Sequence, residues 1–457
     1  MKAASLLLLA SASLPFAGFA ASAAGTPPIK LMVLDPGHFH AGLLQKTMYR
    51  QIDPMVFVYA PDGPDVLDHL KRVDGYNQRV DKPTHWQATV YRGPDYFERL
   101  LKEKPGNAVV MSGNNRGKPG RIKTLVESGI HVFADKPVII DPAGFETLRQ
   151  AFAAAQQKDV VLYDIMTERS EITTMLQREL AQMPDLFGQL ETGTPDNPAV
   201  LMESVHFFYK SVSGVALKRP AWFFDVAQQG EGMVDVGSHL VDLVQWECFP
   251  EKVVDYAKDI QVLSARHWPT PMTAAQFATV TGLGTFPEFL KGSVQGPVLN
   301  VYANGEMNYR IKGVQVRLTA KWDYEAPKGS GDTHYSILRG TKCHLVIRQG
   351  PNENYQPTLY IEGAPDTDPA SLIKALDGAI FRLQSRHPGV DIKPLARSWQ
   401  IVIPSKYDDG HEAHFAEVTE RFLKYIATGE MPAWEVPNMI AKYYTTTKAL
   451  ELARQGK

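Results

Sequence analysis

Short apolar runs alternate with helix-like segments from residue 29 to residue 163. Each run has four to six residues, and the intervening segments 96–104 and 121–128 carry apolar side chains at helical spacing. Strand-length runs that alternate with helices are typical of parallel βαβ units. The sequence therefore predicts an α/β fold that begins with a doubly wound parallel sheet. The predicted strands lie at residues 29–34, 55–60, 88–91, 108–111, 131–134 and 160–163.

The pattern changes near residue 170 to longer alternating strands mixed with helices. Residues 307–311, 315–320 and 344–348 alternate as strands with one buried face, which predicts an α+β domain on a largely antiparallel sheet. We expect a Rossmann-like dinucleotide-binding domain over 25–168 and an α+β substrate and oligomerisation domain over 169–457. Helices predicted at 412–426 and 438–454 close the chain, where they can pack back on the first domain.

The N-terminus has the layout of a cleavable secretory signal. Lys2 precedes an apolar run that ends in small residues at 21–23. The segment has neither a cysteine for lipid attachment nor a twin-arginine pair, so we expect a Sec-type signal over residues 1–24 and a periplasmic protein. The alternative is an uncleaved N-terminal anchor.

Composition narrows the function to small-molecule chemistry. The 457 residues carry a formal charge of −2 and contain no long block of like charges. The sequence therefore lacks the basic patch expected of a protein that binds nucleic acid or an anionic membrane. Two cysteines, Cys248 and Cys343, are too few for a disulfide scaffold, so they are buried apolar residues or form one bridge.

The turn after the first predicted strand is the first place to look for a ligand, because ligands bind beyond the carboxyl ends of such strands. The glycine positions of a G-x-G-x-x-G fingerprint fall on Asp35, Gly37 and His40, so only the middle glycine is present. His38 and His40 flank this turn, with either a direct role or hydrogen bonds to backbone carbonyls. Asp62 follows the second strand, where a ribose-binding acid or an ordinary turn residue would stand.

A lysine stands at the carboxyl end of the fifth predicted strand, in the sequence Asp135-Lys136-Pro137. A partly desolvated lysine beside a carboxylate can hold a substrate hydroxyl and favour its ionised form. A lone lysine in this position would ordinarily be a surface residue.

A second segment, residues 230–246, changes the interpretation of that lysine. If it is helical, Asp235, His239 and Asp242 lie along one face, and apolar residues cover the other. An imidazole flanked by carboxylates can act as a general acid or base near neutral pH. The competing interpretations are a metal ligand and a buried core histidine, and metal is disfavoured because no second histidine or cysteine stands nearby at ligand spacing.

Together, the two motifs resemble the glucose–fructose oxidoreductase and inositol dehydrogenase family, Gfo/Idh/MocA. The resemblance also includes Asn114 after the fourth strand, and it implies NAD or NADP as cofactor. The expected cofactor contacts are Gly37, His38, His40, Asp62, Asn114 and Asp135. It implies catalytic roles beside the nicotinamide for Lys136, Asp235 and His239, with Asp135 where the family usually has Glu. The region with residues 332–340 and 411–415 resembles the dedicated C-terminal region of an exported bacterial branch of this family.

Aromatic and cationic side chains precede the histidine segment. Trp222 could stack on a sugar ring, Lys210 could bind hydroxyls or a carboxylate, and His206 lies in the same stretch, although ordinary packing explains them equally well. We expect Asp242 to contact substrate as well.

These observations predict an NAD(P)-dependent oxidoreductase that acts on a sugar, cyclitol or glycoside, with no bound metal. Two alternatives remain: redox-assisted glycoside cleavage in the same site, and a non-catalytic periplasmic saccharide-binding protein. The resemblance also implies a homo-oligomer formed through the open sheet of the second domain.

Overall fold

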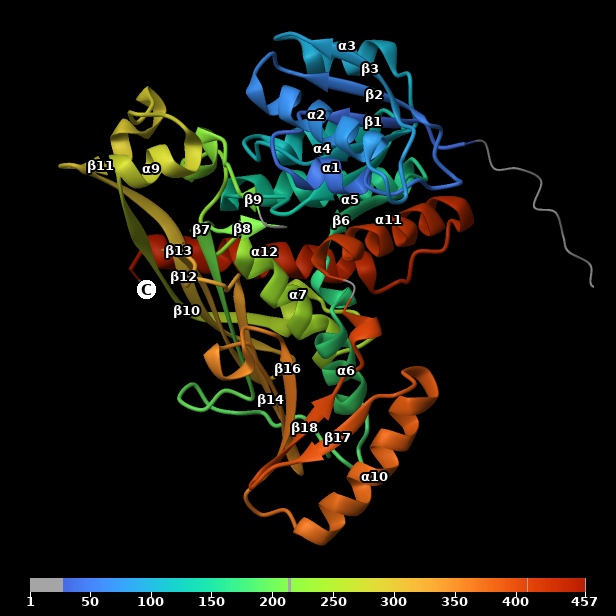
Figure 1. The fold of residues 1–457 in the computed structure, drawn as a ribbon, viewed down its shortest axis with the longest axis vertical. Helices are drawn as coiled ribbons and strands as arrows, with labels where there is room; N and C mark the ends of the chain where they lie inside the picture. Colours follow the sequence, from blue (N-terminus) through green and yellow to red (C-terminus); the bar gives the residue numbers. More distant parts are fainter. Residues whose placement is uncertain (1–27, 213–214, 409, 457) are drawn as a thin grey trace, which may run out of the picture.

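A computed structural model describes residues 28–212, 215–408 and 410–456. The first domain is a six-stranded parallel sheet in the order β3-β2-β1-β4-β5-β6 (Figure 1). This confirms the predicted doubly wound sheet, although the sixth strand begins two residues later than expected. The strands are β1 (Leu31–Leu34), β2 (Met55–Ala60), β3 (Gln87–Arg92), β4 (Ala108–Met111), β5 (His131–Asp135) and β6 (Leu162–Ile165).

Helices cover both faces of this sheet. Gly129 follows α4 with a φ of 76°, a left-handed conformation in which glycine ends a helix without a steric penalty. The helices are α1 (His40–Leu44), α2 (Pro64–Gln78), α3 (Tyr96–Glu103), α4 (Lys118–Glu127) and α5 (Phe145–Gln157).

The second domain is built on a ten-stranded sheet, which is antiparallel except where β7 and β13 pair in parallel. The largely antiparallel sheet is therefore confirmed. Its strands are β7 (Val200–Tyr209), β10 (Ile260–Thr273), β11 (Val294–Gln295), β12 (Val298–Ile311), β13 (Val314–Glu325), β14 (Thr333–Arg339), β15 (Cys343–Arg348), β16 (Thr358–Gly363), β17 (Asp391–Pro394) and β18 (Ser398–Val402). A short hairpin, β8 (Ser211–Val212) and β9 (Val215–Ala216), stands apart from it. Its helices are α6 (Ile172–Ala181), α7 (Val236–Cys248), α8 (Tyr256–Asp259), α9 (Ala274–Thr281) and α10 (Pro369–Arg386).

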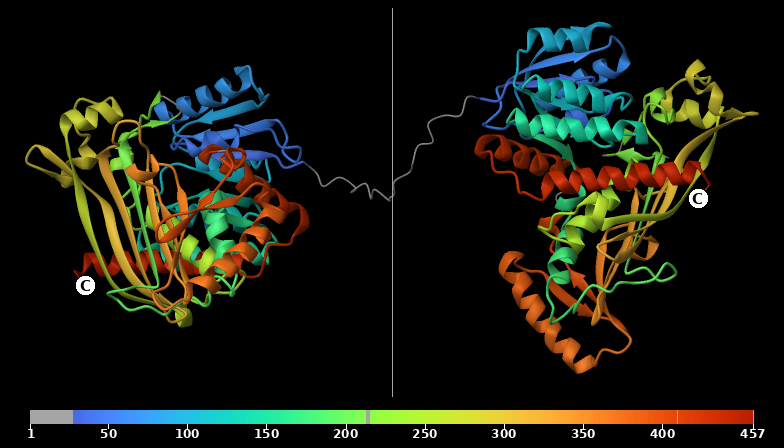
Figure 2. Two further views of the ribbon diagram at one scale, coloured as in Figure 1. Left: turned by 60° about the horizontal axis from the view of Figure 1, so that its bottom comes forward. Right: turned by 180° about the vertical axis from the view of Figure 1, so that it is seen from behind.

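The last two helices, α11 (His411–Thr428) and α12 (Glu435–Arg454), lie between the two domains (Figures 1 and 2). Phe415, Phe422 and Tyr443 belong to the core of the first domain, whereas Ala441 and Leu450 belong to the core of the second. The closing helices therefore pack against the first domain and join the two cores.

A buried charge network holds α7 and α12 against the end of the first sheet. Arg169 donates two hydrogen bonds to Asp242, at 2.6 and 2.7 Å, and contacts Glu435 at 3.1 Å. Lys442 bridges Asp242 and Asp164 at 2.8 and 2.7 Å. Burial opposes ionisation of Asp242, but Arg169 and Lys442 hold the pKa of its carboxyl below the usual range. The predicted substrate contact of Asp242 is therefore wrong, because its carboxylate is already shared by two buried cations.

Three further predictions concern the ends and the cysteines. The signal predicted at residues 1–24 lies outside the described residues. None of the described helices combines the length and the apolar character needed to cross a membrane.

The two cysteines do not form a disulfide. Cys343 is buried, Cys248 is half-buried, and both are free thiols, so the single bridge is excluded.

Asp242→Asn should lower the free energy of unfolding by about 3–5 kcal/mol, because it leaves Arg169 and Lys442 buried beside a neutral amide. The matched control is Asp62→Asn, since Asp62 is exposed and pairs with Arg92 at the surface. That control should cost less than about 1 kcal/mol. Urea unfolding followed by tryptophan fluorescence measures both, and equal effects would contradict the structural role of the network.

Candidate active site

A cavity of about 1250 Å³ opens at the carboxyl ends of β1, β4 and β5. From β1 the chain adds β2 and β3 on one side, and from β4 it adds β5 and β6 on the other. The gap between β1 and β4 is therefore the topological switch point, where sheets of this kind bind ligands. Both domains line the cavity. The predicted site residues among its lining are His38, His40, Asp135, Lys136, His206, Lys210, Asp235 and His239.

Lys136 and Asp235 join the two domains across this cavity. The Lys136 ammonium donates a hydrogen bond of 2.7 Å to Asp235, and both side chains are nearly buried. Burial favours the neutral amine, but the carboxylates of Asp235 and Asp135 outweigh it and raise the pKa of Lys136. Lys136 is therefore a fixed cation that can stabilise a developing negative charge on a substrate oxygen.

His239 lies in the first turn of α7, beside this ion pair. The carboxylates that flank His239 in the sequence do not orient its ring, because Asp235, the residue before α7, bonds Lys136 and makes no side-chain capping hydrogen bond. Nδ1 of His239 is buried and has no hydrogen-bond partner among the described residues. Burial and the Lys136 ammonium lower the pKa of His239 to about 4, so the imidazole is neutral at neutral pH and able to accept a proton.

The turn after β1 does not form an ordinary phosphate cradle. The N–H groups of Gly37 and His38 donate to the carbonyls of Asp35 and Ser112, at 2.9 and 3.0 Å. A Cβ on Gly113 would stand 1.9 Å from the Asp35 carbonyl, so the turn is packed tightly against the loop after β4. The backbone donors that a pyrophosphate would use at Gly37 are thus already satisfied.

Trp222 covers this turn from the second domain. Its indole N–H donates a hydrogen bond of 2.8 Å to Asp65, and a Cβ on Gly37 would lie 3.0 Å from its ring. Trp222 is not among the side chains that line the cavity, so the stacking on a sugar ring predicted for it does not fit this arrangement.

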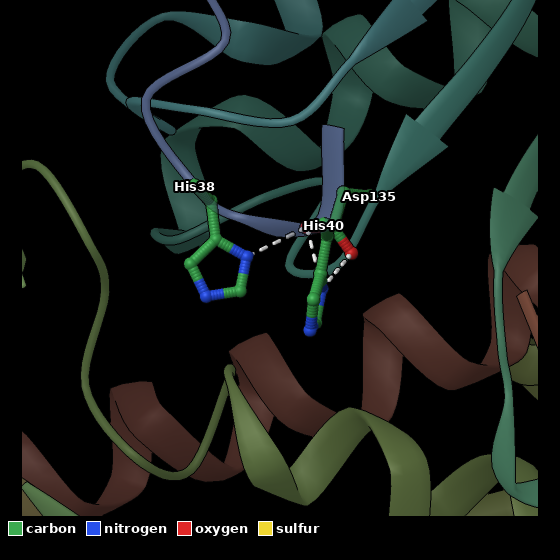
Figure 3. Close-up of side chains that lie close together, drawn as sticks. All are labelled: His38, His40 and Asp135. Carbon is green, nitrogen blue, oxygen red and sulfur yellow. Dashed lines mark hydrogen bonds and ion pairs between the residues drawn. The ribbon is translucent and has the colours of Figure 1, made fainter. Parts of the chain in front are cut away.

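The two histidines of the β1 turn converge on the carboxylate that precedes Lys136 (Figure 3). Nδ1 of His38 lies 3.3 Å from Oδ2 of Asp135, and Nδ1 of His40 lies 3.0 Å from the same oxygen. Ser112 donates to that oxygen at 2.8 Å. Sequence reasoning singled out all three residues as cofactor contacts but missed that they form one cluster, for which the His-x-His spacing was the available signal.

Two of the other predicted cofactor contacts lie away from the cavity. Asp62 is exposed and pairs with Arg92 at 3.2 Å. The Asn114 amide donates to Gln228 at 2.6 Å and so links the first domain to the second. Neither residue lines the cavity, and each is paired with another side chain.

Two predicted substrate residues share one partner that the sequence did not reveal. His206 and Lys210 both contact Asp332, and the His206 Nδ1 distance is 3.0 Å. Burial opposes ionisation, but these neighbours hold the pKa of Asp332 well below its usual range. All three line the cavity opposite the first domain, and they present both charges to a polar ligand.

Comparison with known proteins places the chain among oxidoreductases. Residues 176–454 match the family model described as "Putative oxidoreductase C terminal domain". A crystal structure from Parabacteroides merdae, described as a putative oxidoreductase, is 50% identical, with a TM-score of 0.93 over 94% of this chain and 99% of that chain. No curated protein matches the chain.

More distant structures share the fold. Levoglucosan dehydrogenase, solved with NADH and L-sorbose, is 11% identical with a TM-score of 0.59, and the match covers 94% of this chain and 98% of that chain. KijD10 from Actinomadura kijaniata, a 3-ketoreductase solved with NADP, is 15% identical with a TM-score of 0.55 over the same shares.

His239→Leu should flatten the pH dependence of stability. In the unfolded chain His239 has its ordinary pKa of 6.5, whereas in the folded protein its pKa is about 4. Between these two values the unfolded state binds more protons, so wild-type stability falls as the pH is lowered. Between about pH 7 and about pH 5 the variant should lose about 2 kcal/mol less than wild type in urea unfolding.

His69→Leu is the positive control, because burial lowers the pKa of His69 in α2 to about 4 as well. If the His69 variant flattens the profile and the His239 variant follows wild type, His239 is charged in the folded protein.

Proposed function

The chain belongs to the Gfo/Idh/MocA-type oxidoreductases that carry this C-terminal domain, and we propose that it transfers a hydride between NAD(P) and a hydroxyl-bearing carbon of a sugar, cyclitol or glycoside. The observation that carries the proposal is the meeting of Lys136, Asp235 and His239 at the switch point of the first sheet. Distant structures with the same fold contain NADH with L-sorbose, or NADP, which supports this class of cofactor and substrate.

The residues present fit one end of a dinucleotide better than the other. The nicotinamide end fits, because the cavity reaches from His38 to a fixed ammonium and a neutral imidazole. The pyrophosphate end departs from the usual pattern, because the donors of Gly37 and His38 are satisfied and Trp222 covers the turn. We therefore assign the nicotinamide end to Gly113 and Asn115, which line the cavity after β4.

The chemistry of the chain's own residues follows from their charges. The Lys136 ammonium, oriented by Asp235, donates to the substrate hydroxyl oxygen and stabilises it as the proton leaves. The neutral imidazole of His239, which lines the cavity, accepts that proton. NAD(P), when bound, supplies the hydride acceptor. On the opposite wall, Asp332 with His206 and Lys210 can bind the remaining hydroxyls.

His239→Ala should lower kcat for sugar oxidation at least about 100-fold, because it removes the general base. NADH binding, followed by the fluorescence of the bound dinucleotide, should stay within about threefold of wild type. His85→Ala is the matched control, since His85 is an exposed histidine that does not line the cavity, and its kcat should not change. Full activity in the His239 variant would show that another group takes the proton, and a wild-type protein that binds neither NADH nor NADPH would refute the proposed function.

We propose further that the enzyme acts in the periplasm, after removal of residues 1–24. Intact mass spectrometry of the protein from a periplasmic extract should give a chain that starts near Gly25. Ala23→Arg should block this cleavage, because signal peptidases require small residues at the site. A full-length mass in the cytoplasmic fraction alone would contradict export.

A further inference from the structure

We infer that His38, His40 and Asp135 form a binding site for one divalent transition-metal ion at the wall of the cavity. The inference goes beyond the proposed function, because the three residues could hold a metal whether or not a dinucleotide binds. Each residue offers one ligand atom, and these atoms all lie within 4.8 Å of one another (Figure 3). All three side chains line the cavity.

The buried carboxylate of Asp135, at the end of β5, has no lysine or arginine partner within ion-pair distance among the described residues. Lys118 reaches Asp135 at its backbone carbonyl, at 2.6 Å, rather than at its carboxylate. Lys136 is paired with Asp235. A cation bound here would offset the cost of burying this carboxylate, which in the described chain otherwise has only hydrogen bonds from neutral groups.

The distances also suit a shared ion. The imidazole nitrogens lie 3.0–3.3 Å from the Asp135 oxygens. Charge-assisted hydrogen bonds are shorter, at about 2.7–2.9 Å. A metal with bonds of about 2.0–2.1 Å holds neighbouring ligand atoms about 3.3–3.4 Å apart in a tetrahedral site and about 2.8–3.0 Å apart in an octahedral one, and the observed separations lie between these values.

The ligand set indicates the kind of metal and its use. Two imidazoles and one carboxylate suit Zn²⁺, Co²⁺ or Fe²⁺, and three protein ligands leave at least one position open. Because the cluster lines the cavity, the open position would take water or an oxygen atom of the bound substrate. The hydrogen bond from Ser112 to Asp135 would orient the carboxylate toward the ion.

The test uses the full chain made without a histidine tag and first stripped with a chelator. Equilibrium dialysis against Zn²⁺, with the metal measured by mass spectrometry, should give one ion per chain. Co²⁺ should bind with the visible absorption of a low-coordinate site that has nitrogen ligands. His38→Gln and Asp135→Asn should weaken both affinities at least tenfold, and His85→Gln should leave them unchanged because His85 is exposed and does not line the cavity.

Ser112→Ala provides a milder variant should the ligand variants fail to fold. It removes one hydrogen bond and should weaken Zn²⁺ binding about tenfold. Zinc should also raise the melting temperature of wild type but not of Asp135→Asn. Less than one ion per chain, or equal affinity in wild type, Ser112→Ala and the ligand variants, would overturn the inference. NADH titrations on the same stripped and metal-loaded samples keep failure of this site separate from failure of the proposed function.

Discussion

The buried pairing of Arg169 with Asp242 is the constraint on which the active site depends. Arg169 follows the last strand of the first sheet, and Asp242 lies one turn after His239 on α7. The bidentate contact therefore sets the rotation and depth of α7 relative to the first domain. Buried ion pairs are seldom a large net source of stability, so we attribute this one to positioning. With α7 held, Asp235 meets Lys136 and His239 faces the cavity.

The turn after β1, which forms part of the cavity wall, differs from an ordinary dinucleotide-binding turn. Asp35 occupies a left-handed conformation with a φ of 51°, where the usual fingerprint has a glycine. The backbone donors of the turn bond within the domain, and the side chains of His38 and His40 project toward Asp135 instead. The turn therefore presents imidazoles where its relatives are expected to present N–H groups.

Local patterns explain most of what the sequence predicted correctly. Strand-length apolar runs located the parallel sheet, and helical spacing located α3, α4, α11 and α12. Lys136 and His239 were identifiable because each stands in a short local motif, even though about a hundred residues separate them. The long helix α10 was not predicted, because its apolar residues follow a Pro- and Asp-rich stretch that indicates a loop.

Contacts between distant segments could not be predicted in the same way. Asp242 was predicted to be a site residue because it shares a helical face with His239. Only the structure shows that its carboxylate is bonded to Arg169 and Lys442 and is not available to a substrate. Trp222 meets Asp65 from another domain, and Asp332 reaches His206 and Lys210 from a loop. Each pairing depends on how the two domains dock, which no local spacing encodes.

The position of α11 and α12 determines when the first domain can finish folding during synthesis. Phe415 and Phe422 pack into the core of the first sheet, although the ribosome adds them after nearly all the rest of the chain. The nascent first domain therefore leaves the ribosome with part of its apolar core uncovered until the C-terminal helices are made. Release of a full-length chain, rather than completion of its first domain, is the event that commits this protein to its native state.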